Sequence, residues 1–199
     1  MPKILSIIAP NGYQDKEYED SKKALEKKGH KVITTSAKQT ANGKLGGTTQ
    51  VDILLNDVNP EDYDAVLFVG GPGCYEYQTN QKALSLAKDF FSANKITAAI
   101  CAAPSILAKA GILEGRTITS HPCEKDYLSS LPLTYTGKSV QVDLPIITAD
   151  GPDSAKKFGK AIAKALKYSP TPPSPSSKSP ATKSASAKTG PATPRAALS

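Results

Sequence analysis

The sequence predicts an α/β protein with a mostly parallel central sheet that helices cover on both faces. Within residues 1–168, short stretches rich in β-branched and apolar residues alternate with longer stretches whose apolar residues recur at helical spacing. The chain has 199 residues, 39% of them hydrophobic, which suffices for one domain with a buried core. No repeat of fixed period interrupts this alternation.

Five stretches are predicted as strands because they are short, apolar or β-branched. The first is too short for the apolar region of a signal peptide, and no small-residue cleavage site follows it, so we expect a strand there. Loops at the carboxyl ends of parallel strands are where a functional site is expected. In chain order the strands are Lys3–Ala9, Lys31–Ser36, Ala65–Val69, Ile96–Ile100 and Thr117–Thr119.

Helices are predicted between and after these strands. One opens near Glu17, and another begins at Ala102, directly after Cys101. The last helix is expected to be capped by Asp153 or Ser154, since both residue types favour helix starts. Two further helices follow from apolar residues at helical spacing, which are Ala83, Leu84, Ala87, Phe90 and Phe91 in one and Ala155, Phe158, Ile162 and Leu166 in the other.

The composition changes abruptly after Tyr168. Residues 169–199 contain seven prolines, four basic residues, no acidic residue and a single member of the Leu/Ile/Val/Phe class, Leu198. Such a segment cannot bury enough surface to offset its ordering entropy, so a disordered tail is predicted. The tail holds four of the +7 net charges, and the +3 left on residues 1–168 gives little reason to expect nucleic-acid binding by the folded domain.

The chain has three cysteines, at positions 74, 101 and 123, and their number and spacing indicate the redox compartment of the protein. Their spacing does not suit a zinc site, and an odd count is a poor disulfide framework, so a reduced, cytoplasmic setting without a metal is expected. The chain has no apolar stretch of membrane-spanning length, so no membrane association is expected.

Cys101 lies where a buried strand passes directly into a helix. Unpaired backbone N–H groups at a helix start stabilise negative charge, so the thiol is predicted to ionise more easily there. The alternative is that Cys101 packs as a small hydrophobic residue, as free cysteines often do. Its position at the strand end favours a nucleophilic thiolate.

Gly70 and Gly71 follow the predicted middle strand. They form a tight turn or, in the functional interpretation, point backbone N–H groups into the site and hold an oxyanion together with the N–H of Ala102. The glycines lack the helix-opening GxGxxG and GxxxxGK[ST] arrangements, so phosphate or dinucleotide binding is not predicted.

Glu17 is the acid expected beside Cys101, with Asp15 and Glu19 as competing candidates. If the first strand lies beside the cysteine strand, the loop after it brings a carboxyl group to the thiol. Two anions in contact raise the carboxyl pKa, so a protonated Glu17 hydrogen-bonded to a thiolate is the expected pairing. The alternative is a carboxylate that only interacts with the helix dipole.

The remaining candidates are histidines and cysteines. His121 follows the fifth predicted strand and is either an acid/base at the site or a surface residue. His30 is expected to face solvent. Cys74 and Cys123 are expected to pack or face solvent, although Cys74 lies close enough to the glycine turn to act as a resolving thiol.

Four segments resemble the DJ-1/PfpI superfamily in order and spacing: Val69–Gly73, Ala98–Pro104, Ala110–Arg116 and Ser120–Pro122. The similarity covers about residues 3–167. It implies a flavodoxin-like three-layer sandwich, a homodimer, a reactive cysteine at Cys101 and an acidic partner at the position of Glu17. PfpI-type peptidases place histidine directly after the cysteine, where this chain has Ala102. The chain is therefore more similar to the small DJ-1-like branch, whose histidine corresponds to His121.

Together the residues and the resemblance lead to a glyoxalase of the glyoxalase III type. The expected reaction converts methylglyoxal to D-lactate, or glyoxal to glycolate, through a hemithioacetal on Cys101, and deglycase activity is expected to use the same groups. The expected substrate is a small 2-oxoaldehyde, and no metal or organic cofactor is expected. The alternatives are an oxidative-stress sensor or holdase chaperone based on Cys101 and, third, a cysteine peptidase or amidase.

Overall fold

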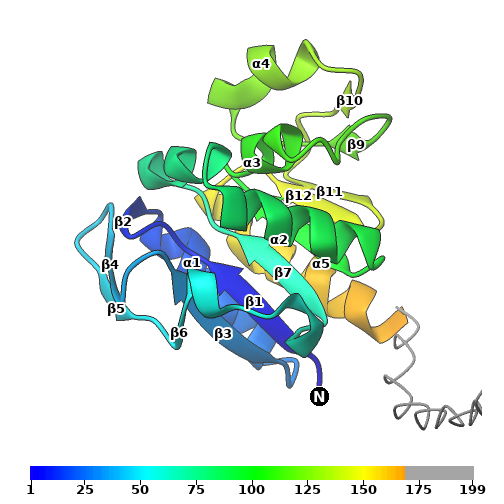
Figure 1. Ribbon diagram of the computed structural model, residues 1–199. Coiled ribbons are helices and arrows are strands. Elements are labelled where there is room, and N and C mark those ends of the chain that lie inside the picture. Colours follow the sequence, from blue (N-terminus) through cyan, green and yellow to red (C-terminus); the bar gives the residue numbers. More distant parts are fainter. Residues whose placement is uncertain (169–199) are drawn as a thin grey trace, which may run out of the picture. The chain divides into compact units, whose positions relative to one another are not determined.

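The computed structural model describes residues 1–168, and the tail predicted to be disordered lies outside these described residues. The predicted α/β fold with a mostly parallel central sheet is confirmed (Figure 1). Seven strands form this sheet in the order β11-β12-β8-β7-β1-β3-β6. Only the edge strand β11 is antiparallel to its neighbour. Their bounds are β1 Lys3–Ile7, β3 Lys31–Ser36, β6 Ile53–Leu54, β7 Ala65–Phe68, β8 Ile96–Ile100, β11 Val140–Asp143 and β12 Ile146–Ala149.

Two small sheets flank the central one. β2 (Asn11–Tyr13), β4 (Thr40–Gly43) and β5 (Thr48–Gln50) form one, and β9 (Thr117–Ile118) and β10 (Thr134–Tyr135) form the other. The fifth predicted strand thus exists as β9 but lies outside the central sheet. Side chains explain this: the N–H of Thr117 donates to Asp143 Oδ2 and that of Thr119 to Thr148 Oγ1, so side-chain acceptors replace a backbone ladder.

Helices cover both faces of the central sheet (Figure 1). α1 and α5 pack against each other on one face. On the other face α2 contacts β7 and β8, and α3 contacts β8. None of the helices within residues 1–168 is long and apolar enough to cross a membrane. The bounds are α1 Asp15–Glu26, α2 Gln81–Ser92, α3 Pro104–Lys109, α4 Lys125–Ser129 and α5 Ala155–Tyr168, with 3-10 turns η1 Leu55–Asp57, η2 Pro60–Asp62, η3 Pro72–Gln78, η4 Pro122–Glu124 and η5 Pro152–Ser154.

The central strands are buried along almost their whole length. Every residue of β7 and β8 is buried, which is the pattern expected for parallel strands covered on both faces. The predicted apolar positions of α5, among them Phe158 and Ile162, are buried as well. The core therefore continues from the sheet into the helices that cover it.

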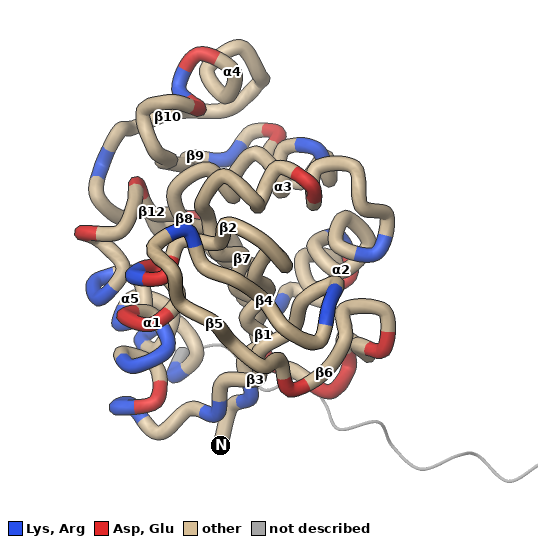
Figure 2. Tube along the Cα trace, turned by 90° about the vertical axis from the view of Figure 1, so that its left-hand side faces the viewer, with Lys and Arg blue, Asp and Glu red and all other residues tan. Residues whose placement is uncertain are grey.

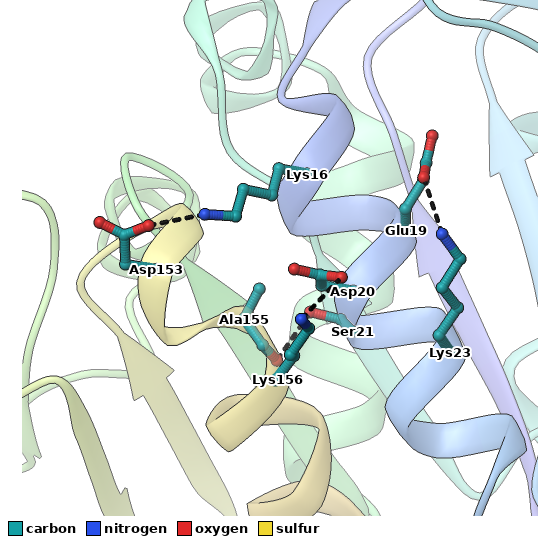
Figure 3. A network of polar contacts seen from close by, with 8 residues as sticks. All are labelled: Lys16, Glu19, Asp20, Ser21, Lys23, Asp153, Ala155 and Lys156. Carbon is teal, nitrogen blue, oxygen red and sulfur yellow. Dashed lines mark hydrogen bonds and ion pairs between the residues drawn. The ribbon is translucent and has the colours of Figure 1, made fainter.

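Polar contacts join α1 to the start of α5 (Figure 3). Lys16 Nζ lies 2.6 Å from Asp153 Oδ1, and the Ser154 hydroxyl donates to Asp150. The side chains of Asp153 and Ser154 are thus used in other contacts, and neither makes the capping hydrogen bond predicted for it. Figure 2 shows acidic and basic residues interspersed along α1, the helix that carries Glu17.

Gly159 of α5 lies directly against α1. A Cβ atom at this position would lie 2.8 Å from Ala24 Cβ and 2.8 Å from the Ser21 carbonyl oxygen. Alanine favours a helix interior more than glycine by about 1 kcal/mol, but the rigid neighbours leave no room for it. We expect Gly159→Ala to lower the free energy of unfolding by roughly 1–3 kcal/mol, the usual cost of overpacking.

Urea denaturation measures this change, with Lys157→Ala on the exposed side of the same helix as the control. The control should change the free energy of unfolding by less than about 0.5 kcal/mol. An increase in stability for Gly159→Ala would contradict the close packing described here.

Candidate active site

Cys101 occupies a sharp turn at the carboxyl end of β8. Its φ angle is 65°, a conformation that a residue with a side chain adopts only when its surroundings enforce it. Two backbone hydrogen bonds do so, from the Cys101 N–H to the Ala149 carbonyl and from the His121 N–H to the Cys101 carbonyl, both at 2.9 Å. The helix that follows begins at Pro104 rather than at Ala102 as predicted, because residues 101–103 form the turn.

Glu17 lies in the first turn of α1 and is fully buried. Its Oε2 accepts a hydrogen bond of 3.0 Å from the Gly70 N–H, and its carboxyl group hydrogen-bonds the Cys101 side chain. The other oxygen, Oε1, receives no hydrogen bond from an N–H or O–H group of the described residues. Burial raises the pKa of Glu17 to about 7, so about half of the molecules carry a proton on this carboxyl group at neutral pH.

Glu17 reaches Cys101 by a route that differs from the predicted one. The first strand does not lie beside the cysteine strand, because β7 runs between β1 and β8. Gly70 lies just after β7, and it has no side chain that would separate Glu17 from Cys101. A Cβ atom there would lie 2.6 Å from Cys101 Cβ and 2.8 Å from Glu17 Oε2. Since the Gly70 N–H is bound to Glu17, the oxyanion role predicted for Gly70 is wrong, and this glycine instead brings the acid and the thiol into contact.

The two competing carboxylates have other partners. Asp15 accepts hydrogen bonds of 2.8 Å from the N–H groups of Leu45 and Gly47, and so holds the turn between β4 and β5. Glu19 forms an exposed ion pair of 3.0 Å with Lys23 on the surface of α1 (Figure 3). Of the three candidates, only Glu17 contacts the cysteine.

The pKa of the Cys101 thiol is raised, whereas the sequence predicted that it would be lowered. Burial is the largest cause, followed by the negative charge of Glu17, and the N–H groups of Gly71 and Ala102, which hydrogen-bond the sulfur, only partly offset them. Protonation of Glu17 removes the opposing charge and converts the carboxyl group into a donor. One negative charge shared by the thiol and the acid is therefore the stable arrangement.

His121 lies at the site as predicted, but its ring contacts a different cysteine. Nδ1 accepts a hydrogen bond of 3.2 Å from the Cys123 N–H and lies 3.0 Å from Cys123 Sγ. His30, predicted to face solvent, is buried with 7% of its surface exposed, and burial lowers its pKa. That prediction was wrong because the end of α5 lies over the turn that carries His30, as the interactions of its ring with Ala163 and Lys167 show.

An open cleft of about 340 Å³ lies over the sulfur of Cys101, a size at the lower end of small-molecule sites. Cys74 is fully buried, and burial raises the pKa of its thiol to about 12, so it does not reach this cleft as a resolving thiol. Five lining residues were not singled out from the sequence, because loops far apart in the chain supply them. The cleft is lined by Gln14, Lys44, Gly71, Pro72, Tyr75, Cys101, Ala102, His121, Cys123 and Pro152.

Metal binding finds no support in this part of the chain. Among residues 1–168 no group of three or more His, Cys, Asp and Glu side chains is placed to hold an ion. What the cleft offers chemically is a thiol beside a buried acid, two backbone N–H donors at the sulfur, an imidazole and a second thiol.

Proteins already known resemble this chain along most of the part that the structure describes. The family model described as DJ-1/PfpI matches residues 2–165. A protein from Pyrococcus horikoshii named as a deglycase is 34% identical over 166 residues, which cover 83% of this chain and 99% of the relative. An uncharacterized protein from Methanocaldococcus jannaschii is 38% identical over 169 residues, covering 83% and 82% of the two chains.

Solved structures extend the comparison. The ThiJ/PfpI domain protein from Brachyspira murdochii superimposes with a TM-score of 0.80 at 36% identity, covering 83% of this chain and 96% of that one. DJ-1beta from Drosophila melanogaster gives a TM-score of 0.78 at 30% identity, with 83% and 90% covered.

The raised pKa of Glu17 predicts how stability depends on pH. Below about pH 4.5 this carboxyl group is protonated in both states. Between about 4.5 and 7 the unfolded chain releases the proton while the folded chain keeps it, so folding loses up to about 3 kcal/mol as the pH rises. Since Glu17→Gln removes this titration, we expect the variant to be progressively more stable than wild type across that range.

Urea unfolding at several pH values measures the difference, with Glu19→Gln as an exposed carboxyl control on the same helix. The control should not show a pH-dependent gain. A gap between Glu17→Gln and wild type that stays constant with pH would show that Glu17 keeps an ordinary pKa.

Proposed function

Because this chain belongs to the DJ-1/PfpI family, we propose that it is a cofactor-independent enzyme that acts on small 2-oxoaldehydes through Cys101. In this proposal methylglyoxal becomes lactate and glyoxal becomes glycolate, the chemistry of a glyoxalase III. The observation that carries it is the contact between the Cys101 thiol and the buried Glu17 carboxyl group, which has a pKa of about 7. A thiol and an acid of this kind supply a nucleophile and a proton shuttle in one place.

The first step is addition of the Cys101 thiolate to the aldehyde carbon. The N–H groups of Gly71 and Ala102 hydrogen-bond the sulfur before the reaction. Once the C–S bond forms, the sulfur no longer carries the negative charge, and these donors become available to the oxyanion beside it. Protonation of that oxygen gives a hemithioacetal.

The second step moves a proton between adjacent carbons. The Glu17 carboxylate removes the hydrogen from the former aldehyde carbon to give an enediol, and returns it to the neighbouring carbon to give a thioester. A pKa of about 7 suits a group that must accept and donate a proton at neutral pH. Hydrolysis of the thioester then releases the hydroxy acid and restores the Cys101 thiol.

Lys44 and His121 line the same cleft and supply polar contacts for the substrate. The positive charge of Lys44 also lowers the pKa of Glu17 and so partly opposes the effect of burial. In the proposed reaction Lys44 attracts the ketone oxygen and then the carboxylate of the product, and His121 assists proton transfer to these oxygens.

Deglycase activity fits the same groups. In a hydroxyl-bearing adduct between an aldehyde and an amine or thiol, the Cys101 thiolate forms its C–S bond at the former aldehyde carbon while the bond to the amine or thiol breaks. Glu17 protonates the leaving group, and the same hemithioacetal results. The relatives from Pyrococcus horikoshii and Pyrococcus abyssi carry the name deglycase, and they align with this chain over nearly their whole length. The open cleft admits a substrate attached to a larger molecule.

Peptide hydrolysis receives less support. Ala102 stands directly after Cys101, and the imidazole nearest the site, His121, has its Nδ1 directed to Cys123. A peptidase needs a base beside its nucleophile and a proton donor for the leaving amine. Glu17 is the acid at Cys101, and its placement suits proton transfer on a small substrate.

Methylglyoxal consumption with lactate detection tests the proposed function. We expect Cys101→Ser to abolish turnover and Glu17→Gln to reduce kcat by roughly 10²–10⁴-fold, the usual contribution of general acid/base catalysis. His121→Ala should lose only part of the activity because Glu17 carries the carbon-to-carbon proton transfer.

Glu19→Gln is the matched control for Glu17→Gln and should retain wild-type turnover, since Glu19 lies on the exposed surface of the same helix. Circular dichroism confirms that each variant is folded. Full activity in Cys101→Ser, or equal activity in Glu17→Gln and Glu19→Gln, would overturn the mechanism.

A further inference from the structure

A second thiol faces the same cleft as Cys101. Cys123 is exposed and is the middle residue of η4, where it lines the cleft together with Cys101 and His121. Polar groups surround its sulfur: His121 Nδ1 at 3.0 Å, Glu124 Oε1 at 3.8 Å and the Tyr75 hydroxyl at 4.0 Å. The aldehyde reaction described above does not use this thiol.

The imidazole of His121 is positioned as a base for Cys123. Because the Cys123 backbone N–H donates to Nδ1, this nitrogen carries a lone pair rather than a hydrogen. The same lone pair faces Sγ at 3.0 Å and accepts the thiol proton when Cys123 ionises. The Tyr75 hydroxyl is engaged with Glu124 Oε1 at 2.5 Å, which ties η3 to η4 at the mouth of the cleft.

Cys101 lies beside an acid, whereas Cys123 lies beside a base. The acid Glu17 contacts its sulfur, and backbone N–H groups of Gly71 and Ala102 are directed at it. A protonated Glu17 can donate its proton to a leaving oxygen, as cleavage of an O–O bond by a thiolate requires. One thiol thus lies beside an acid, and the other lies beside a base.

A backbone hydrogen bond links the segments that carry these two thiols. The His121 N–H donates to the Cys101 carbonyl at 2.9 Å, so the segment that carries Cys123 begins against Cys101. A 3-10 helix rises only about 2 Å per residue, which keeps Cys123 close to the His121 backbone. A disulfide requires the two α-carbons to approach within about 7 Å.

We propose that Cys101 and Cys123 form a redox pair that reduces hydroperoxides and closes an intramolecular disulfide. The Cys101 thiolate attacks the terminal oxygen of the hydroperoxide, the O–O bond breaks, and Glu17 protonates the departing oxygen to give an alcohol or water. Cys101 is thereby oxidised to a sulfenic acid. The Cys123 thiolate, its proton taken up by His121, then attacks that sulfur, forms the S–S bond and releases water. This activity does not depend on the proposed aldehyde reaction.

Mass spectrometry of the full chain after treatment with one equivalent of hydrogen peroxide tests the pair. We expect the wild-type mass to fall by two hydrogen atoms, with a peptide crosslink between residues 101 and 123 that dithiothreitol removes. Cys101→Ser and Cys123→Ser should both lose this crosslink completely. In Cys123→Ser, a sulfenic acid trapped by dimedone and then a sulfinic acid should accumulate at Cys101.

Cys74→Ala is the matched control, because Cys74 is buried and should not take part in the crosslink. Dibromobimane, which becomes fluorescent after alkylating two thiols, reports on the reduced proteins in the absence of any oxidant. It should label wild type and Cys74→Ala but neither serine variant. His121→Ala should slow the decay of the Cys101 sulfenic acid without slowing its formation.

The proposal is overturned if wild type forms a sulfinic acid at Cys101 while Cys123 stays reduced. A disulfide that joins two chains, or one that includes Cys74, would overturn it as well. No aldehyde is present in these measurements, so a failure of the aldehyde reaction leaves their outcome unchanged.

Discussion

The site depends on a carboxyl group buried against a thiol. Raising the pKa of Glu17 from 4.5 to about 7 corresponds to about 3 kcal/mol that the folded protein loses at neutral pH. The fold sustains this loss because α1 is fixed at both ends of its buried face. Gly159 lets α5 pack closely on α1, and Asp15 ties the first turn of α1 to the turn between β4 and β5. Glu17 therefore stays beside Cys101 even though water would solvate its charge better.

Sequence reasoning predicted the parts of the site that follow from strand ends. The buried run before Cys101, the glycines after the middle strand and the carboxylates after the first strand all mark loops at one edge of the sheet. It did not predict the order of the strands, because hydrophobic pattern specifies that a strand is buried and not which strand lies next to it. β7 therefore lies unexpectedly between β1 and β8, and Gly70 has a different role from the predicted one. The strands β11 and β12 were also missed, although β12 is fully buried.

The pKa of the Cys101 thiol depends on residues that lie far from it in the sequence. Two backbone N–H groups do hydrogen-bond the sulfur, as a position before a helix suggests. Burial and the neighbouring carboxylate outweigh them, and both arise from long-range packing that residue spacing does not reveal. Cys123 is exposed, one of the two outcomes expected for it, but its place in the cleft was not predicted because this depends on the backbone contact between His121 and Cys101.

Two thiols in one cleft would compete if their surroundings were alike. Their neighbours differ in a way that gives each thiol its own role. Glu17 beside Cys101 protonates the leaving oxygen, and His121 beside Cys123 removes the proton of the attacking thiol. Glu17 is fully buried, and its carboxyl group hydrogen-bonds the Cys101 side chain. His121, in contrast, is partly exposed. Because the His121 N–H is bound to the Cys101 carbonyl, the backbone of the first thiol helps to hold the base that lies beside the second.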